Sequence, residues 1–295
     1  MTENSRVQNG SCGQGCPTYE INSFDYRRWG SKPRKIDFSE LYLKSFDRIY
    51  VVMTRNIKLK IEYDGTDFSG WQKQPKLRTV QGEIEDKLNR ILQEKIILIG
   101  SGRTDVGVHA LEQVANFKTE SELSPDSVYK GLNSLLLEDI LIKDIEEADL
   151  DFNSRYGAKS RVYRYKICLG KDIFLRRFAW EVSYCLDLSK IKKATKIILG
   201  RQDFTSFCVS KSVKPDNHCQ VMRADWKKDG NRLEFEIEAN RFLHTMVRSL
   251  VGTLSDVGRG YFSLKDFADI LKAKDHRKAG LTAPAKGLYL AKVNY

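Results

Sequence analysis

The 295-residue chain lacks a long hydrophobic run, because no stretch approaches the roughly 18 consecutive apolar residues typical of a membrane-spanning helix. Its first residues, 2–5, also lack the basic and then apolar pattern of a secretory signal. We therefore expect a protein with no membrane segment that is located in the cytoplasm.

Cysteine is scarce and scattered. The six cysteines are Cys12, Cys16, Cys168, Cys185, Cys208 and Cys219. This distribution, in a chain of this length, argues against a disulfide scaffold and indicates reduced thiols. Cys12 and Cys16 form a single pair with no second pair and no nearby histidine, so the ligand count predicts no metal site. The four histidines are equally dispersed, and none has the spacing of a metal-binding helix.

The chain also lacks an excess of acidic residues. It has 50 Lys and Arg against 39 Asp and Glu, a formal net charge of +11. A basic balance of this size favours a polyanionic partner, and nucleic acid is the first candidate. The content of 41% hydrophobic and 30% charged residues is that of an ordinary globular protein, neither disordered nor fibrous.

One glycine-rich segment stands between two apolar runs, at residues 96–99 and 114–117. It reads Gly-Ser-Gly-Arg-Thr-Asp-Val-Gly-Val-His-Ala over residues 100–110. Its glycines permit a tight bend, which puts the single carboxylate, Asp105, at an exposed tip. Arg103 lies two positions earlier, so in an extended segment both side chains project to the same side. A neighbouring cation favours the ionised form that a carboxylate nucleophile needs, although an ordinary surface hairpin with a solvated ion pair would use the same residues.

This segment resembles the catalytic loop of the tRNA pseudouridine synthase A family, where a Gly-Arg-Thr-Asp-x-Gly-Val-His-Ala motif carries the nucleophilic aspartate. Recognisable blocks of similarity extend from about Asn56 to Tyr295. The resemblance implies an isomerase that needs no cofactor, acts as a homodimer, and converts uridine to pseudouridine at positions 38 to 40 in the anticodon stem-loop of tRNA. It makes Asp105 the nucleophile.

The first half of the similar region predicts six elements. Residues 57–63 alternate apolar and polar side chains, as a half-buried strand does. A helix to about Glu94 follows the N-cap candidate Thr79, and a second helix to about Leu137 follows Ser124 and Pro125. Further strands are expected at residues 96–100, 111–118 and 140–145. The resulting order of strand, helix, strand, strand, helix, strand is ferredoxin-like.

Two aromatic side chains in this half, Phe68 and Trp71, lie in a turn that resembles the family's first signature. They either stack on or shape an RNA cleft, or belong to the core.

The second half opens with Ala-Lys-Ser-Arg-Val-Tyr-Arg-Tyr-Lys-Ile at residues 158–167, where basic and aromatic residues alternate. Cations for phosphates and rings for unstacked bases are the composition that RNA binding uses, although strands rich in Tyr and Arg are also common without RNA. The segment resembles the family's second motif, and Tyr163 matches the tyrosine that packs at the target base. The resemblance also makes Tyr163 a candidate for removing the C5 proton.

The remaining elements of the second half are a helix at 188–199, a hairpin about Asp229 and Gly230, a helix beginning near Asn240, a short helix at 264–271 and a strand at 288–293. The apolar stripe of the helix after Asn240 leaves Arg248 on its polar face. The resemblance makes Arg248 the basic residue beside the catalytic acid. It implies that Arg103 and Arg248 orient Asp105 and the flipped nucleotide.

We therefore predict an α+β protein of two ferredoxin-like halves, at 53–155 and 156–295, whose antiparallel sheets share a central RNA-binding cleft. Residues 1–52 form an N-terminal extension, disordered or partly helical, with one amphipathic stretch at 37–52. The resemblance does not cover this extension, and Met53 looks like a family-type start. We expect the extension to be dispensable.

Two other functional classes fit parts of the sequence. A non-catalytic RNA-binding protein would use the same scaffold but would not require Asp105. A glycoside hydrolase would need a second acid as proton donor, and no Asp or Glu near Asp105 is marked for that role. Within the synthase chemistry, attack at the anomeric carbon, attack at uracil C6 and a glycal route all remain open.

Overall fold

The structure, a computed structural model, describes residues 53–295. These residues belong to one compact unit, and the predictions for residues 1–52 lie outside the described range. Every helix within residues 53–295 is too short or too polar to cross a membrane. Across the same residues, no group of His, Cys, Asp and Glu side chains is arranged to hold a metal ion.

The first half has the predicted order of elements. These are β1 (Arg55–Tyr63), α1 (Val80–Leu92), β2 (Ile99–Gly100), β3 (His109–Thr119), α2 (Pro125–Leu135) and β4 (Ile140–Ala148). Thr79 caps α1 by accepting a hydrogen bond from the backbone of Gly82, and Ser124 caps α2 with Pro125 in its first turn. The predicted strand at 96–100 is shorter than expected, since only Ile99 and Gly100 pair with β3.

The second half is longer. Its strands are β5 (Ser160–Leu169), β6 (Trp180–Val182), β7 (Gly200–Asp203), β8 (His218–Asp229), β9 (Arg232–Ala239) and β10 (Leu288–Asn294), and its α-helices are α3 (Leu188–Thr195), α4 (Met246–Arg259) and α5 (Leu264–Ala273). The hairpin at Gly230 is confirmed. The helix expected from Asn240 begins only at Met246, because Thr245 has the left-handed φ of 62° and interrupts the helical path.

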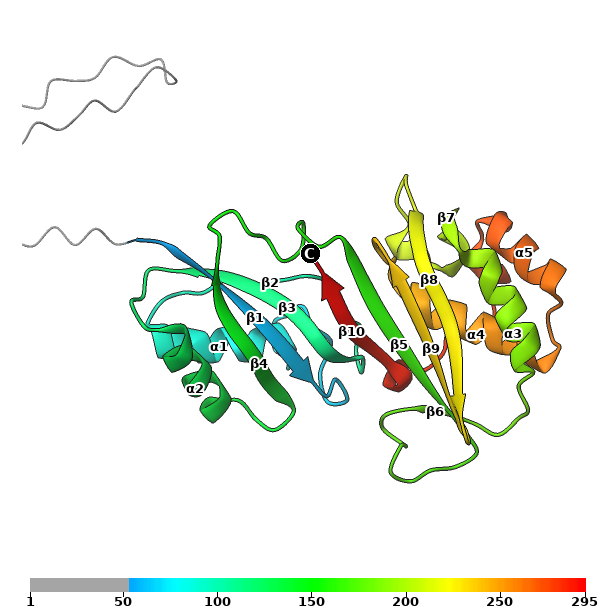
Figure 1. Cartoon of the computed structure of the whole chain (residues 1–295), viewed down its shortest axis with the longest axis horizontal. Coiled ribbons are helices and arrows are strands. Elements are labelled where there is room, and N and C mark those ends of the chain that lie inside the picture. The colour runs from blue at the N-terminus through cyan, green and yellow to red at the C-terminus, as the bar shows by residue number, and fades with distance from the viewer. Residues whose placement is uncertain (1–52) are drawn as a thin grey trace, which may run out of the picture. The chain divides into compact units, whose positions relative to one another are not determined.

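The two halves share one continuous mixed sheet in the order β4-β1-β3-β10-β5-β9-β8-β7. The last strand, β10, joins them, and Figure 1 shows it in red between β3 and β5. It runs parallel to β3 and antiparallel to β5. The predicted α+β class with two strand-and-helix halves is confirmed, and β10 brings the start of β3, which follows Asp105, close to β5, which carries Tyr163.

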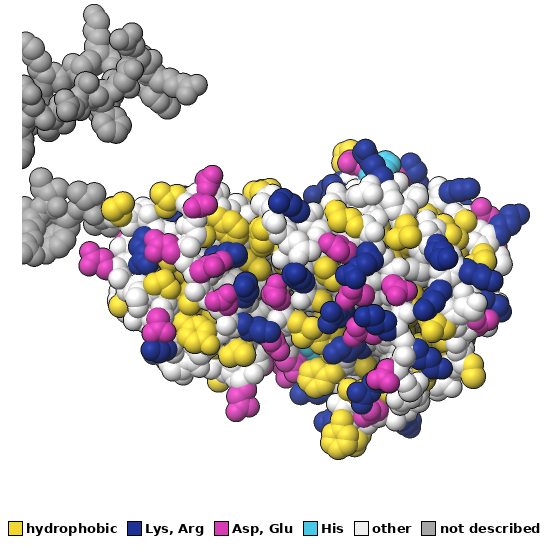
Figure 2. Space-filling model, viewed as in Figure 1, with side chains coloured by type: hydrophobic (Ala, Val, Ile, Leu, Met, Phe, Trp, Pro, Cys, Tyr) yellow, Lys and Arg dark blue, Asp and Glu magenta, His cyan; other side chains and the backbone are white. Residues whose placement is uncertain are grey.

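The two sides of the sheet differ in composition. Side chains on one side, such as Leu59, Ile61 and Phe235, are completely buried in the core. The other side carries ion pairs between adjacent strands, which we call the charged sheet face. Its pairs are Lys58 with Glu146 (2.7 Å), Lys60 with Asp144 (2.9 Å) and Arg164 with Glu236 (2.7 Å). Figure 2 shows basic and acidic side chains interspersed over the strands rather than gathered into a patch of one sign.

Phe68 and Trp71 belong to the core, and each side chain is only 2% exposed. Of the two alternatives left open by the sequence, the core position is confirmed and stacking on RNA is excluded for these buried rings. Gly70, between them, has a φ of +89°, and a Cβ atom there would lie 2.8 Å from the carbonyl oxygen of Thr104. This close approach folds the turn inward under the Asp105 loop, so the two rings support the loop from the core instead of facing outward.

Candidate active site

The loop before Asp105 is fixed by buried hydrogen bonds to side chains of β1 and β3. Ser101 donates to the Gln113 side chain (2.7 Å), and the Gln113 amide donates to the carbonyl of Gly102 (2.9 Å). The hydroxyls of Tyr63 and Thr104 lie 2.7 Å apart. Because these groups are buried, losing any one of them leaves an unpaired polar atom in the core. The loop is therefore held rigidly on β1 and β3.

Arg161, on β5, also holds this loop. This role was not predicted from the sequence. Its guanidinium donates to the carbonyl oxygens of Ser101 (2.7 Å), Arg155 (2.9 Å) and Asn240 (3.0 Å). It therefore ties the Asp105 loop to the segment that leads into α4. The available signal was its position two residues before Tyr163 on β5, which puts both side chains on the same side of the sheet.

Asp105 lies at the tip of the loop, with 24% of its side chain exposed. Its Oδ2 lies 3.4 Å from Nη1 of Arg248, which is 143 positions later in the chain. Its Oδ1 lies 3.3 Å from Nε2 of His244. The carboxylate thus has a nitrogen partner on each oxygen and still reaches solvent.

Arg248 is itself held in place. Its Nε donates to the carbonyl of Ala283 (2.8 Å), and the Ala283 amide donates back to the carbonyl of Arg248 (3.1 Å). The helix packs closely against this segment, because a Cβ atom on Gly252 would overlap the carbonyl of Leu281. The first turn of α4 and residues 281–283 therefore fix the guanidinium beside Asp105.

Arg103 is exposed, and the ion pairs that Asp105 makes within residues 53–295 are with His244 and Arg248. The expectation from the sequence, that Arg103 lies beside Asp105, assumed that this segment is extended. The buried Thr104 between the two residues is instead bound to Tyr63, and the chain turns there. The Arg103 side chain is thus left on the surface beside the site.

Tyr163 is 9% exposed and packs edge-on against Phe242, with 4.9 Å between ring centroids. Burial raises the pKa of its hydroxyl far above the usual range, and the negative charge of Asp105 adds to this effect. The hydroxyl is therefore protonated at neutral pH. Tyr163 offers a ring and a hydrogen-bond donor at the site, but not a base.

The basic and aromatic residues of β5 do not share one surface. Tyr163 lies on the core side with Asp105, whereas Arg164 belongs to the charged sheet face and is paired with Glu236. Lys166, on that face too, lies 4.2 Å from the centre of the Tyr289 ring. The interleaved basic and aromatic patch expected from the sequence is thus divided between two faces.

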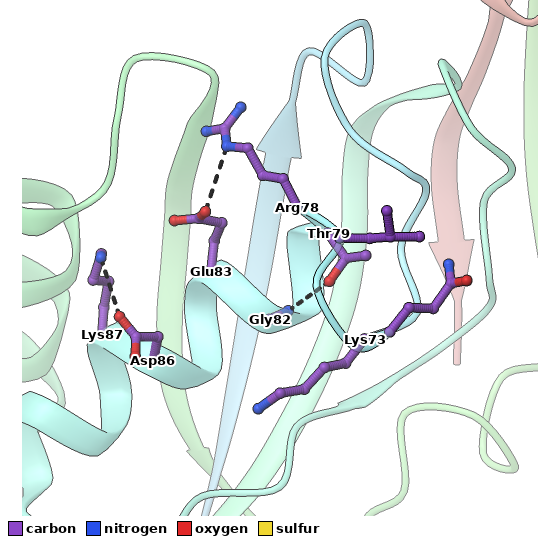
Figure 3. Close-up of a pocket in the computed structure, with 9 residues that line it drawn as sticks. Lys73, Arg78, Thr79, Gly82, Glu83, Asp86 and Lys87 are labelled. Carbon is purple, nitrogen blue, oxygen red and sulfur yellow. Dashed lines mark hydrogen bonds and ion pairs between the residues drawn. The ribbon is translucent and has the colours of Figure 1, made fainter.

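A separate hollow lies at the N-terminus of α1 and does not include Asp105. Figure 3 shows its basic and acidic side chains, with Arg78 paired to Glu83 and Lys87 paired to Asp86. Lys73, the third basic residue of the hollow, is paired with Glu85. Each basic side chain here already has a carboxylate partner, so the hollow shows no preference for an anion.

Comparisons with known proteins point to one family. The family model described as tRNA pseudouridine synthase matches residues 60–157 and 194–295. The protein named tRNA pseudouridine synthase A from Geobacillus sp. (strain WCH70) is 45% identical over 246 residues, covering 82% of this chain and 99% of the relative. The protein of the same name from Geobacillus kaustophilus (strain HTA426) is 46% identical over 247 residues, covering 82% of this chain and 95% of the relative.

A solved structure, the crystal structure of a Cbf5-Nop10-Gar1 complex, is similar over 80% of this chain and 58% of its own chain, at 12% identity. Its TM-score of 0.32 is too low to carry any conclusion.

Proposed function

Because the chain belongs to the tRNA pseudouridine synthase family, we propose that it isomerises uridine to pseudouridine at positions 38 to 40 in the anticodon stem-loop of tRNA, with Asp105 as the nucleophile. The observation that carries the proposal is the environment of Asp105. Its carboxylate is partly exposed, has Arg248 and His244 on its two oxygens, and lies on a loop fixed by buried hydrogen bonds.

The chemistry requires access to a base that is stacked in the RNA. The enzyme flips the uridine out of its stack, at a cost of a few kcal/mol that phosphate contacts and stacking offset. The N1–C1′ bond then breaks and the uracil leaves with the electron pair. After the ring rotates, its C5 bonds to C1′, the C5 proton is released, and N1 takes up a proton. Atoms balance, so no cofactor is needed.

Asp105 stabilises or traps the electron-poor sugar while uracil is detached, as a carboxylate does in glycosidases. Attack at the anomeric carbon, attack at C6 and the glycal route each place the same carboxylate next to the nucleotide. Arg248 compensates the charge of Asp105 and orients it. The exposed Arg103 is free to bind a phosphate of the flipped nucleotide.

We assign Tyr163 the role of packing against the flipped base. Its ring is already held by Phe242, so it offers a fixed surface with little ordering cost. The raised pKa of its hydroxyl argues against a role in removing the C5 proton. The proton passes instead to Asp105 or to solvent.

The distribution of charge supports tRNA binding on the side of Asp105. On the charged sheet face, Lys58, Lys60 and Arg164 are neutralised by carboxylates on the next strand. A tRNA phosphate that bound to this face would have to displace a carboxylate from each of these cations. Arg103 is exposed and is not paired with Asp105, so binding a phosphate would not break that contact. We expect log affinity for tRNA to fall with log salt in proportion to the phosphates contacted.

Two further parts of the proposal rest on the family alone. A homodimer is expected and is tested by sedimentation of the full chain. A cytoplasmic location follows from a tRNA substrate and is tested by fractionation.

The deciding experiment uses unmodified tRNA carrying tritium at uridine C5. The proposal predicts release of tritium to water together with pseudouridine at positions 38 to 40. A non-catalytic RNA-binding protein would bind this tRNA and release no label. A glycoside hydrolase would release free uracil that still carries tritium, and either result contradicts the proposal.

A further inference from the structure

We propose that His244 is a positioning residue that holds the Asp105 carboxylate for reaction, an inference that rests on the proposed function. His244 lies in the short segment before α4, and its Nε2 is 3.3 Å from Oδ1 of Asp105. Arg248, one helical turn later, takes Oδ2. One segment therefore supplies a partner to each oxygen of the carboxylate.

The chemistry of this contact limits the form of the His244 ring. Nε2 lies at ion-pair distance from Oδ1 of Asp105, and because an ionised carboxylate only accepts, the contact is favourable when Nε2 carries a hydrogen. In the neutral ring Nδ1 is then an acceptor, and the hydroxyl of Ser212 lies 2.8 Å from it. Ser212 can donate that bond. The contact with Ser212 therefore supports the ring orientation in which Nε2 faces Asp105.

Two backbone features on the C-terminal side of His244 help to hold it in this place. Its carbonyl oxygen accepts from the amide of Val209 (3.5 Å), in the segment that also carries Ser212. The next residue, Thr245, has a φ of 62°, a conformation that a β-branched residue rarely adopts. Strain of this kind is retained only where the surroundings impose it, and it is concentrated at functional sites. Thr245 therefore marks the turn that directs His244 and Arg248 toward the same carboxylate.

Two donors on different oxygens define the plane of the carboxylate, which one donor cannot do. Because a misplacement of about 1 Å can cost on the order of 100-fold in rate, loss of His244 should slow the reaction while leaving tRNA binding unchanged. Ser212 contacts His244 rather than Asp105. Its loss should therefore slow the reaction less than loss of His244, and should have no effect once His244 is absent.

The test compares His244→Ala, His244→Gln and Ser212→Ala with a matched control, His276→Ala. His276 is a similarly exposed histidine, and it contacts Ser210 (3.0 Å) in the same segment. The side chains that contact His276 are those of Ser210 and Asp275, so it does not reach Asp105. Single-turnover tritium release and tRNA Kd are measured for each full-length variant.

We expect His244→Ala to slow the single-turnover rate by about 10- to 100-fold, with Kd within about twofold of the unsubstituted protein. Gln keeps an N–H donor near Asp105, so His244→Gln should recover most of the rate. Ser212→Ala should have a smaller effect and none in the His244→Ala background. An unchanged rate in His244→Ala, an equal loss in His276→Ala, or a loss confined to Kd would overturn the proposal.

A second measurement does not depend on activity. The melting temperature is measured for Asp105→Ala, His244→Ala and the double variant. The decrease in the double variant should differ from the sum of the two single decreases, because the contact between the two side chains can be lost only once. The matching cycle with His276→Ala should be additive. Additivity in both cycles would refute the contact. By contrast, an unsubstituted protein that releases no tritium would refute the proposed function and leave the outcome of the cycle intact.

Discussion

Asp105 and the carboxylates of the charged sheet face are both paired with cations, but in different ways. On the sheet face, Asp144 pairs with Lys60 at 2.9 Å and Glu236 pairs with Arg164 at 2.7 Å, between residues that the strand register sets side by side. Asp105 has partners at 3.3 and 3.4 Å, and both come from the segment leading into and starting α4, far along the chain.

The difference separates charge pairs set by the strand register from a carboxylate whose partners depend on tertiary packing. Pairs on adjacent strands form wherever the sheet forms, and exposed pairs of this kind contribute little, about 0.2 to 1 kcal/mol. The Asp105 cluster requires the fixed loop, the left-handed turn at Thr245 and the packing of α4.

The largest effect that sharpens this comparison is expected at Arg248. Replacing it by Gln removes the cation on Oδ2 of Asp105, and loss of one such preorganised donor costs about 10² to 10³ in rate. Arg248→Lys keeps the charge but cannot serve both Ala283 and Asp105 as the planar guanidinium does, so its loss should be intermediate. Single-turnover rates rank the three proteins, and equal rates would contradict the role.

Tyr163 should show the next largest effect, on binding. Tyr163→Phe keeps the ring and should preserve tRNA affinity. Tyr163→Ala removes a stacking surface worth about 1 to 3 kcal/mol per base. Kd by filter binding and the unfolding free energy are both measured, since Tyr163 also packs against Phe242. If Phe and Ala variants bind and turn over alike, Tyr163 is only a core residue.

The charged sheet face should tolerate substitution. Arg164→Gln breaks the pair with Glu236, both ends of which are at least partly exposed. We expect the free energy of unfolding to fall by no more than about 1 kcal/mol, with no change in tRNA affinity or rate. A marked loss of tRNA binding would show that this face belongs to the RNA interface.

The smallest effect is expected from removing residues 1–52. A chain beginning at Met53 retains Arg103, Asp105, Tyr163 and Arg248, and should match the full chain in tRNA affinity and tritium release. The rival view is that the basic cluster at 32–35 docks tRNA. A large loss of binding in the shortened protein would favour that view.

The sequence could predict the fold well because its signals are local. The alternation of β1, the caps at Thr79 and Ser124, and the turn at Gly230 each follow from short-range chemistry. The burial of Phe68 and Trp71 could not be predicted, because it depends on how Gly70 meets a loop more than 30 positions away.

The candidate site was predictable only in part. Asp105, Tyr163 and Arg248 came from family motifs, and the structure brings Asp105 and Arg248 into contact. His244 and Arg161 were missed because their partners, Asp105 and the carbonyl of Ser101, lie in other segments of the chain. No residue spacing within one segment carries that information. The left-handed turn at Thr245 likewise has no local signal, since β-branched residues disfavour it.

The most direct test of the central claim replaces one carboxylate from each set. Asp105→Asn and Asp144→Asn both remove a single charge with little change in size, and each is compared with the unsubstituted full chain in single-turnover tritium release and tRNA Kd. We predict that Asp105→Asn falls below about a hundredth of the original rate, since even acid-base roles contribute about 10² to 10⁴, while its Kd is retained. Asp144→Asn should keep both. A rate above that level in Asp105→Asn, or an equal loss in Asp144→Asn, would contradict the assignment of Asp105 as the nucleophile.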